Sequence, residues 1–251
     1  ELLLSDPGAF LQNLMDIKKN WSEWFNLQSR RRECWVNEWS NHIDAETQKD
    51  NRIHPLQLSL DVQKEMNEED WLVFDGGNTH FWSEIAVNIA GWKGQRLGGI
   101  MHPGNYSLLG VGVSFGISAK NLNPDKNVVV ISGDGAFLSG GLSIEAAFQE
   151  GLPITVVIDN NGGLDCISQQ QERLFSNGKH FATDFRDIPF HAMFEGLGGY
   201  GEMVTKREEI GPALRRAIAS GKTACLNVKC KGVISPIVAA TSDKRDKASI
   251  E

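Results

Sequence analysis

Short apolar runs alternate with amphipathic segments along most of the chain after residue 70. The apolar runs are nearly continuous, which is typical of strands buried on both faces of a parallel sheet. The segments between them carry apolar residues at helical spacing. This alternation predicts a doubly wound α/β fold whose mostly parallel sheet has helices on both faces. The predicted strands are 71–74, 127–132, 154–158 and 224–229, and the predicted helices are 107–120, 143–150 and 206–219.

The first 50 residues follow a different pattern. A stretch of helical spacing there contains Trp21, Trp24, Trp35 and Trp39. Aromatic side chains at this density need a surface to pack on, so we expect a short helical segment that docks on the main domain or on a preceding one. The polar stretch 44–52 is expected to be a linker, and Pro55 to begin a helix that runs towards Glu69. The predicted organisation is 1–50 as the end of a preceding domain and a helical linker, 51–235 as the main domain, and 236–251 as a C-terminal tail or lid.

Composition narrows the class of protein. The formal net charge of -7 disfavours a nucleic-acid-binding surface, which needs clustered Lys and Arg. No apolar run approaches the roughly 20 residues that span a bilayer, and no secretory or lipidation signal is visible. Cys34, Cys166, Cys225 and Cys230 form no CxxC pair and no zinc-type spacing with histidine. These features predict a cytoplasmic protein with reduced thiols and no membrane or nucleic-acid partner.

Polar residues follow two of the predicted strands at the point where each ends. Asp134 comes directly after one strand, and Asn161 follows the next strand along the chain. The carboxyl ends of parallel strands joined by a right-handed crossover reach the same edge of a sheet. A carboxylate, an amide oxygen and a nearby backbone carbonyl form an all-oxygen ligand set that suits Mg²⁺ bound partly by a phosphate.

Glycines surround the predicted metal residue. Gly133 and Gly135 permit a tight turn and let backbone N–H groups approach a ligand closely. The N-terminus of the helix that follows favours an anion. These features together predict a clamp for a diphosphate. A dinucleotide-binding dehydrogenase is disfavoured, because neither Gly110-Val111-Gly112 nor Gly133-Asp134-Gly135 has the third glycine of GxGxxG at the required spacing.

The GDG sequence at 133–135, followed one βα unit later by Asn160-Asn161, resembles the signature of thiamine-diphosphate enzymes. Two further stretches agree in order with the superfamily of acetolactate synthase, oxalyl-CoA decarboxylase and 2-hydroxyacyl-CoA lyase. One follows a predicted strand and the other precedes a predicted helix. They are Asp75-Gly76-Gly77-Asn78-Thr79-His80-Phe81-Trp82 and Gly104-Asn105-Tyr106-Ser107-Leu108-Leu109-Gly110-Val111-Gly112. The resemblance spans roughly residues 55 to 235 and is to the C-terminal, diphosphate-binding domain of these enzymes.

The resemblance implies roles for individual residues. Asp134 and the side chain of Asn161 would hold Mg²⁺, with the carbonyl of Gly163 as a further ligand. Leu109 would be the apolar buttress that bends thiamine diphosphate, and the backbone at Ser107 and Leu109 would bind its aminopyrimidine. Ser107 stands where relatives often have glycine, which is tolerable because only a carbonyl is needed there. The cofactor-binding set is Asn78, Thr79, Ser107, Leu109, Gly133, Gly135, Ala136 and Asn161.

The activating glutamate of these families lies on a separate pyrimidine-binding domain of a neighbouring subunit. No such domain is recognisable in the sequence, so the resemblance implies an active site completed by another chain or subunit, in a homo- or hetero-oligomer. The opening residues 1–14 resemble the end of the family's middle domain, and the chain begins at Glu1 rather than Met. We therefore expect either the C-terminal part of a three-domain polypeptide or one subunit of a split enzyme.

The substrate is less clearly indicated. The Gly77-Asn78-Thr79 element is more similar to acyl-CoA lyases and oxalyl-CoA decarboxylases than to acetolactate synthases. This favours a C–C bond lyase, carboligase or decarboxylase that acts on a 2-hydroxyacyl-CoA or a 2-oxo acid. An acetolactate synthase-type transferase on pyruvate and a non-catalytic cofactor-binding subunit are the alternatives. His80, His102 and Tyr106 are the candidate substrate contacts.

Overall fold

The computed structural model of the protein describes residues 20–49, 51–175 and 180–239. The chain divides into two compact units, Glu1–His42 and Ile43–Glu251. The boundary between the units falls within one long helix, α2 (Ser22–Lys49). The second unit contains the sheet and every residue predicted to bind cofactor or metal.

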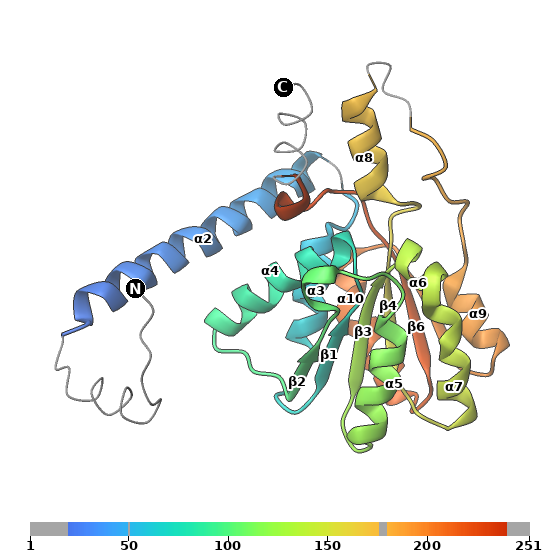
Figure 1. Ribbon diagram of the computed structural model, residues 1–251. Coiled ribbons are helices and arrows are strands. Elements are labelled where there is room, and N and C mark those ends of the chain that lie inside the picture. Colours follow the sequence, from blue (N-terminus) through green and yellow to red (C-terminus); the bar gives the residue numbers. More distant parts are fainter. Residues whose placement is uncertain (1–19, 50, 176–179, 240–251) are drawn as a thin grey trace, which may run out of the picture. The chain divides into compact units, whose positions relative to one another are not determined.

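A six-stranded sheet forms the centre of the second unit (Figure 1). All five strand pairs are parallel, and the strand order is β2-β1-β3-β4-β6-β5. The chain first builds the sheet outward from β1 in one direction, then returns past β1 to continue on its other side. This reversal makes the fold doubly wound and creates a crevice at the carboxyl ends of the central strands. The strands are β1 (Trp71–Phe74), β2 (Gly99–Met101), β3 (Val128–Gly133), β4 (Thr155–Asn160), β5 (Tyr200–Val204) and β6 (Ala224–Lys229).

Alternate residues of each central strand contribute to cores on opposite faces of the sheet. In β3, Val129 and Ile131 pack into one apolar cluster, whereas Val128 and Val130 pack into the other. Successive side chains of a strand point to opposite faces, so a sheet covered on both sides needs apolar residues at every position. This requirement is the physical reason for the continuous apolar runs in the sequence.

Two layers of helices cover the sheet (Figure 1). The cluster on one face includes side chains of α3 (Pro55–Lys64) and α10 (Ile210–Ala219), and α4 (Asn78–Trp92) packs beside α3. The cluster on the other face includes α5 (Gly112–Leu122), α6 (Asp134–Gly140), α7 (Ile144–Gln149) and α9 (Phe190–Gly196). α8 (Asp165–Leu174) follows β4, and the single-turn 3₁₀ helices are η1 (Gly104–Tyr106), η2 (Gly141–Ser143) and η3 (Arg207–Glu209).

The predicted fold class is confirmed, and the four predicted strands lie within one or two residues of the observed ones. The sequence analysis missed β2 and β5. β2 is only three residues long, and β5 is an edge strand whose sequence, Tyr-Gly-Glu-Met-Val, mixes polar and apolar residues. The prediction of a linker over 44–52 was wrong up to Lys49, because α2 continues to that residue.

The predicted helix 107–120 begins five residues later than expected, at Gly112. Residues 104–106 form the 3₁₀ turn η1 instead, and Ser107 has a left-handed backbone with φ of 47°. A left-handed residue cannot continue a right-handed helix. The segment 104–111 is therefore a loop, which lies where the predicted cofactor contacts fall.

The first unit is described only from residue 20. Its described part has two aromatic pairs in edge-to-face contact, Trp21, just before α2, with Trp24, and Trp35 with Trp39 in α2. Trp21 and Trp24 remain about half exposed. The predicted end of a middle domain at residues 1–14 lies outside the described residues, as does the predicted C-terminal tail or lid from residue 240 onward. Among the described helices, none is long and apolar enough to cross a membrane.

Leu226 tests the account of the core. It is fully buried in β6, so Leu226→Ala should remove both transfer free energy and packing and lower the free energy of unfolding by about 2–5 kcal/mol. Leu122→Ala, at a position that is 77% exposed, should change it by no more than about 0.5 kcal/mol. Urea denaturation followed by circular dichroism measures both. Equal effects of the two substitutions would contradict the core assignment.

Candidate functional site

A pocket of about 270 Å³ lies at the carboxyl ends of β1, β3 and β4. It contains every residue that the sequence analysis assigned to cofactor or metal, including Asp134, Asn161 and Gly163. Their roles in binding stay predictions, but the fold gathers them from four separate loops into one cavity. The lining residues are Gly76, Gly77, Asn78, Thr79, Ser107, Leu109, Gly133, Asp134, Gly135, Ala136, Asn161, Gly163, Leu164, Asp165, Cys166 and Ile167.

Asp134 is the buried carboxylate of this pocket. Its Oδ1 accepts a hydrogen bond from the Gly135 N–H at 2.7 Å, and its Oδ2 accepts from the N–H groups of Gly162 at 2.8 Å and Gly163 at 3.1 Å. Burial raises the pKa of Asp134 to about 6, although these three N–H groups favour the ionised form. The nearby charge of Asp165 raises the pKa further. The negative charge of the ionised carboxylate is therefore only partly compensated by its surroundings.

The loop after β4 brings further oxygen atoms to Asp134. Gly133 pairs with Asp159 across β3 and β4, so both strands end at the same level. Gly162 has a φ of 86°, which turns the chain back so that the amides of Gly162 and Gly163 face Asp134. Asn161 Oδ1 lies 3.2 Å from the Gly163 nitrogen. The loop is thus folded around the carboxylate, and the Gly163 N–H lies between Asp134 Oδ2 and Asn161 Oδ1.

The N-terminus of α4 forms another wall of the pocket. Its N-cap, Gly77, offers no side chain to bond the first amides of this 15-residue helix, and free N–H groups at a helix N-terminus favour an anion. The side chain of Asn78 is already engaged, however. Its Nδ2 donates to the carbonyl of Val233 at 2.6 Å, and its Oδ1 accepts from the Ser235 N–H at 2.7 Å. Contact between Asn78 and a diphosphate would therefore use the backbone N–H unless these bonds break.

Close backbone packing makes one pocket glycine necessary. A Cβ on Gly76 would lie 2.2 Å from the Ser107 carbonyl oxygen, whereas one on Gly135 would lie 2.5 Å from Leu164 Cδ2, the end of a side chain. Ser107, the departure from glycine noted in the sequence, keeps a left-handed backbone and accepts a hydrogen bond from the Gly77 N–H at 2.8 Å. Its side chain thus joins the loop 104–111 to the start of α4. Leu109 is 41% exposed at the pocket wall.

Asp75 is a structural residue that the sequence analysis quoted but gave no role. It is completely buried at the end of β1, and its Oδ1 accepts from the N–H groups of Gly76 at 2.8 Å, Gly110 at 2.9 Å and Val111 at 3.1 Å. Its Oδ2 accepts from the Ser132 hydroxyl at 2.9 Å. One carboxylate therefore connects β1, β3 and the loop 104–111. The only sequence signal was an acidic residue directly after an apolar strand.

Asp159 is a second buried carboxylate that the sequence analysis did not single out. Thr79 donates its hydroxyl to Asp159 Oδ2 at 3.0 Å. Burial, and next the charge of Asp134, raise the pKa of Asp159. Thr79 is thereby fixed in orientation at the pocket wall.

The three candidate substrate contacts lie apart from the pocket lining. His80 is 1% exposed and lies 3.2 Å from the Ser107 hydroxyl. His102 is exposed, and Tyr106 is 96% exposed. Their contact with substrate stays a prediction, and His80 contacts the pocket residue Ser107.

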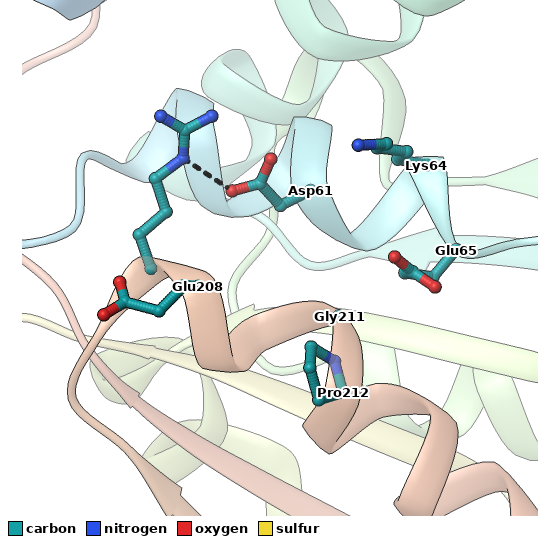
Figure 2. Close-up of a pocket in the computed structure, with 7 residues that line it drawn as sticks. Asp61, Lys64, Glu65, Glu208, Gly211 and Pro212 are labelled. Carbon is teal, nitrogen blue, oxygen red and sulfur yellow. Dashed lines mark hydrogen bonds and ion pairs between the residues drawn. The ribbon is translucent and has the colours of Figure 1, made fainter.

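A larger cavity, of about 410 Å³, lies between α3 and the η3–α10 segment (Figure 2). Its lining mixes both charges, and the charges pair with one another: Arg207 Nε lies 2.9 Å from Asp61 Oδ2. Arg215 pairs with Glu65 beside it. None of its lining residues belongs to the predicted site. The pairs join two helices of one layer, and we assign this cavity no role in binding. Its lining residues are Asp61, Lys64, Glu65, Arg207, Glu208, Gly211 and Pro212.

A pocket bounded by glycine turns and a helix N-terminus, at the carboxyl edge of a parallel sheet, is typical of domains that bind phosphate-bearing cofactors. The chain belongs to one family of such proteins. The model of the family described as thiamine pyrophosphate enzyme, C-terminal TPP binding domain, matches residues 75–228. Thiamine pyrophosphate is another name for thiamine diphosphate, so the predicted family is confirmed.

Similar proteins agree with this family. The chain is 30% identical to a probable acetolactate synthase of Mycobacterium bovis over 70% of its own length and 31% of the relative's. It is 29% identical to oxalyl-CoA decarboxylase of Escherichia coli K12, over 96% of this chain and 41% of the relative. It is 25% identical to 2-hydroxyacyl-CoA lyase 2 of Bos taurus, over 83% of this chain and 32% of the relative. The chain thus spans roughly a third of the length of these relatives.

A solved structure supports the fold. The thiamine diphosphate-dependent 4-hydroxybenzoylformate decarboxylase of Rhodococcus jostii RHA1 superposes with a TM-score of 0.61 at 24% identity, over 73% of this chain and 34% of that one. The shared α/β architecture therefore extends to a protein of low sequence identity.

Replacement of Asp75 should destabilise the whole pocket. Asp75→Ala leaves three backbone N–H groups and the Ser132 hydroxyl without their acceptor, which should lower the free energy of unfolding by about 3 kcal/mol or more. Asp75→Asn keeps one acceptor oxygen and should lose less. Asp187→Ala, at an exposed ion pair with Lys229, is the control and should cost at most about 0.5 kcal/mol. Urea denaturation measures the free energy of unfolding of the three variants. An Asp75→Ala protein as stable as the Asp187→Ala control would refute the structural role of Asp75.

Asp134 should make stability depend on pH. Its folded-state pKa of about 6 lies above the unfolded value of 3.8. Below pH 3.8 both states hold the proton, and between pH 3.8 and 6 only the folded state does. Without metal or cofactor, the wild-type protein should therefore lose stability relative to Asp134→Ala as pH rises from about 4 to 6, by up to about 3 kcal/mol. Urea denaturation in EDTA measures the difference, and a pH-independent difference would contradict the shift.

Proposed function

We propose that the pocket binds thiamine diphosphate together with Mg²⁺. In this proposal the Asp134 carboxylate, the Asn161 side-chain oxygen and the Gly163 carbonyl hold the metal. The observation that carries it is the environment of Asp134, a buried carboxylate with a raised pKa, which accepts hydrogen bonds from three backbone N–H groups of the described chain. A divalent cation would supply the missing positive charge, and hard oxygen ligands favour Mg²⁺.

The diphosphate would lie between the N-terminus of α4 and the turn after β3. Asn78 and Thr79, at the start of α4, and Gly135 and Ala136, in the turn after β3, line this space. The aminopyrimidine would bind the backbone at Ser107 and Leu109, and the Leu109 side chain would bend the cofactor. The hydrogen bond from Gly77 to Ser107 supports this arrangement because it fixes the pyrimidine-side loop against the diphosphate side.

A second surface is expected to cover the pocket. Tyr106, Leu108 and Leu142 are 96%, 61% and 74% exposed. They come from two segments that are packed tightly against each other. The contact is between Gly110 and Gly140, where an added Cβ on Gly140 would lie only 2.1 Å from the Gly110 carbonyl oxygen. Exposed apolar side chains gathered at a site mark a surface for a partner. We infer that a pyrimidine-binding domain of another chain or subunit docks here and brings the activating glutamate, which gives a homo- or hetero-oligomer.

The reaction we propose is the cleavage or formation of a C–C bond next to a carbonyl, in a 2-hydroxyacyl-CoA or a 2-oxo acid. The cofactor supplies the electron sink for this chemistry, and the residues of this chain bind it, bend it and exclude water from it. The similarity to oxalyl-CoA decarboxylase over nearly the whole chain supports this substrate class. Transfer chemistry on pyruvate, of the acetolactate synthase type, is the alternative supported by the probable acetolactate synthase.

The organisation of the chain follows from the same proposal. Residues 51–235 form the cofactor domain, 1–50 the end of a preceding domain with its helix, and 236–251 a tail or lid. The bonds from Asn78 and Trp82 to Val233, at 2.6 and 2.8 Å, support a C-terminal segment held at the edge of the pocket. We propose a cytoplasmic location for the protein.

Calorimetric titration of thiamine diphosphate tests the cofactor site. Binding is expected with Mg²⁺ and is expected to disappear with EDTA or in Asp134→Ala, because the diphosphate is then left without its metal. Asp165→Asn is the matched control, since Asp165 also lines the pocket but is outside the proposed ligand set, and it should keep metal-dependent binding. Unchanged binding by Asp134→Ala would show that the metal assignment is wrong.

Turnover separates the proposed enzyme from a non-catalytic cofactor-binding subunit. The protein purified with any co-purifying partner, together with thiamine diphosphate and Mg²⁺, should consume a 2-oxo acid or an acyl-CoA. A mass of the intact assembly above 27.7 kDa is expected, because the activating glutamate must come from elsewhere. Metal-dependent binding without turnover of any of these substrates, in an assembly that contains a pyrimidine-binding domain, would favour the non-catalytic alternative.

A further inference from the structure

Three metal-binding side chains converge beside the cofactor pocket. His80 and Glu84 are one turn apart on α4, and His102 follows β2. Each side chain offers one ligand atom, and these atoms all lie within 4.8 Å of one another. The sheet order explains why these side chains are close. β2 pairs with β1, so His102, which follows β2, lies beside α4, the helix that follows β1.

We propose that His80, Glu84 and His102 form a binding site for a divalent transition-metal ion of the zinc class, separate from the Mg²⁺ site. Two imidazoles and one carboxylate are ligands that zinc and its neighbours prefer over Mg²⁺, which favours oxygen alone. Three protein ligands leave a coordination position open for water or another small ligand.

Aromatic packing orients both imidazoles before any ion binds. The His80 ring stacks on Phe81 with centroids 5.1 Å apart and an interplanar angle of 5°. The His102 ring stacks on Phe74 at 5.0 Å and 7°. The two imidazole centroids are 5.0 Å apart. An ion would therefore meet two oriented rings.

Ser107 provides the outer support that a metal-bound histidine needs. A ligating imidazole normally donates its second N–H to an oxygen. His80 Nδ1 lies 3.2 Å from Ser107 Oγ, whereas Nε2 faces Glu84 Oε1 at 3.2 Å. In the metal-bound form Nδ1–H donates to Ser107, and Nε2 is the ligand atom. Ser107 is itself fixed by the Gly77 N–H.

The charges around the cluster also favour a cation. In the described chain, the Glu84 carboxylate pairs with His80 and with no Lys or Arg. Among the described residues, no ammonium or guanidinium group therefore competes with an ion for this carboxylate.

Small movements of the exposed ligands complete the site. Zinc bonds of about 2.0–2.2 Å require ligand atoms closer together than 4.8 Å. His80 is buried, whereas the Glu84 side chain is 37% exposed and His102 is exposed, so these two can move inward. His102 Nδ1 accepts a bond from the Gly104 N–H at 3.2 Å. If His102 binds the ion through Nε2, the imidazole proton moves to Nδ1. The Gly104 N–H then loses its acceptor and, being exposed, donates to water instead.

Cobalt provides the test, because Co²⁺ bound by nitrogen and oxygen ligands at low coordination number gives visible absorption bands that Co²⁺ in water does not match. The purified protein, stripped with EDTA and dialysed into excess Mg²⁺, should bind one equivalent of Co²⁺ with these bands, and Zn²⁺ should displace it. Glu84→Gln and His102→Ala alter exposed positions, and each should weaken Co²⁺ affinity by at least about tenfold. Thermal melts establish that both variants fold.

His180→Ala is the matched control. His180 also lies between two carboxylates, Glu172 at 3.1 Å and Asp184 at 2.9 Å, but outside the cluster, so its loss should leave the Co²⁺ spectrum unchanged. The proposal is overturned if the wild-type protein gives no such bands in excess Mg²⁺. It is equally overturned if Glu84→Gln and His102→Ala bind Co²⁺ like the wild type. Neither result depends on thiamine diphosphate, so failure here is distinct from failure of the cofactor site.

Discussion

Two buried aspartates, each accepting three backbone N–H groups, hold the loops at the carboxyl edge of the sheet together. Asp75 joins the turn after β1 to the loop before α5, through Gly76, Gly110 and Val111. Asp134 joins the turn after β3 to the loop after β4 in the same way. Loops rich in glycine have no core of their own, so these charge-assisted bonds set their shape. Both carboxylates therefore hold loops that line the pocket.

The two aspartates differ in one respect on which the proposed function depends. Asp75 is enclosed and has a fourth donor in the Ser132 hydroxyl. Asp134 lines the pocket. Its pKa is raised because burial destabilises the ionised carboxylate more than its three N–H bonds stabilise it. A buried charge that is not fully compensated is destabilising unless it is paired. In the proposed function, a divalent cation on a diphosphate would provide that pairing and would couple cofactor binding to local stability at this residue.

Much of the fold and most of the pocket could be predicted from the sequence. Strands buried on both faces require continuous apolar runs, and Asp134 and Asn161 directly follow two of them. β2 was missed because three residues are too few to show a hydrophobic pattern. β5 was missed because it is an edge strand of mixed polar and apolar residues. The role of Asp75 and the bonds from Asn78 to Val233 and Ser235 were missed for another reason. They join residues distant in sequence, and local pattern does not report which loops will meet.

The central claim is that Asp134, Asn161 and Gly163 bind a divalent metal that carries the diphosphate of thiamine diphosphate. A crystal structure of the protein with thiamine diphosphate and Mn²⁺ in place of Mg²⁺ tests it most directly, because anomalous scattering locates Mn²⁺ independently of the model phases. The account predicts one Mn²⁺ peak about 2.1–2.3 Å from an Asp134 carboxylate oxygen, the Asn161 side-chain oxygen and the Gly163 carbonyl oxygen, with diphosphate oxygens completing the shell. Cofactor bound with the peak elsewhere, or with no metal beside Asp134, would contradict it.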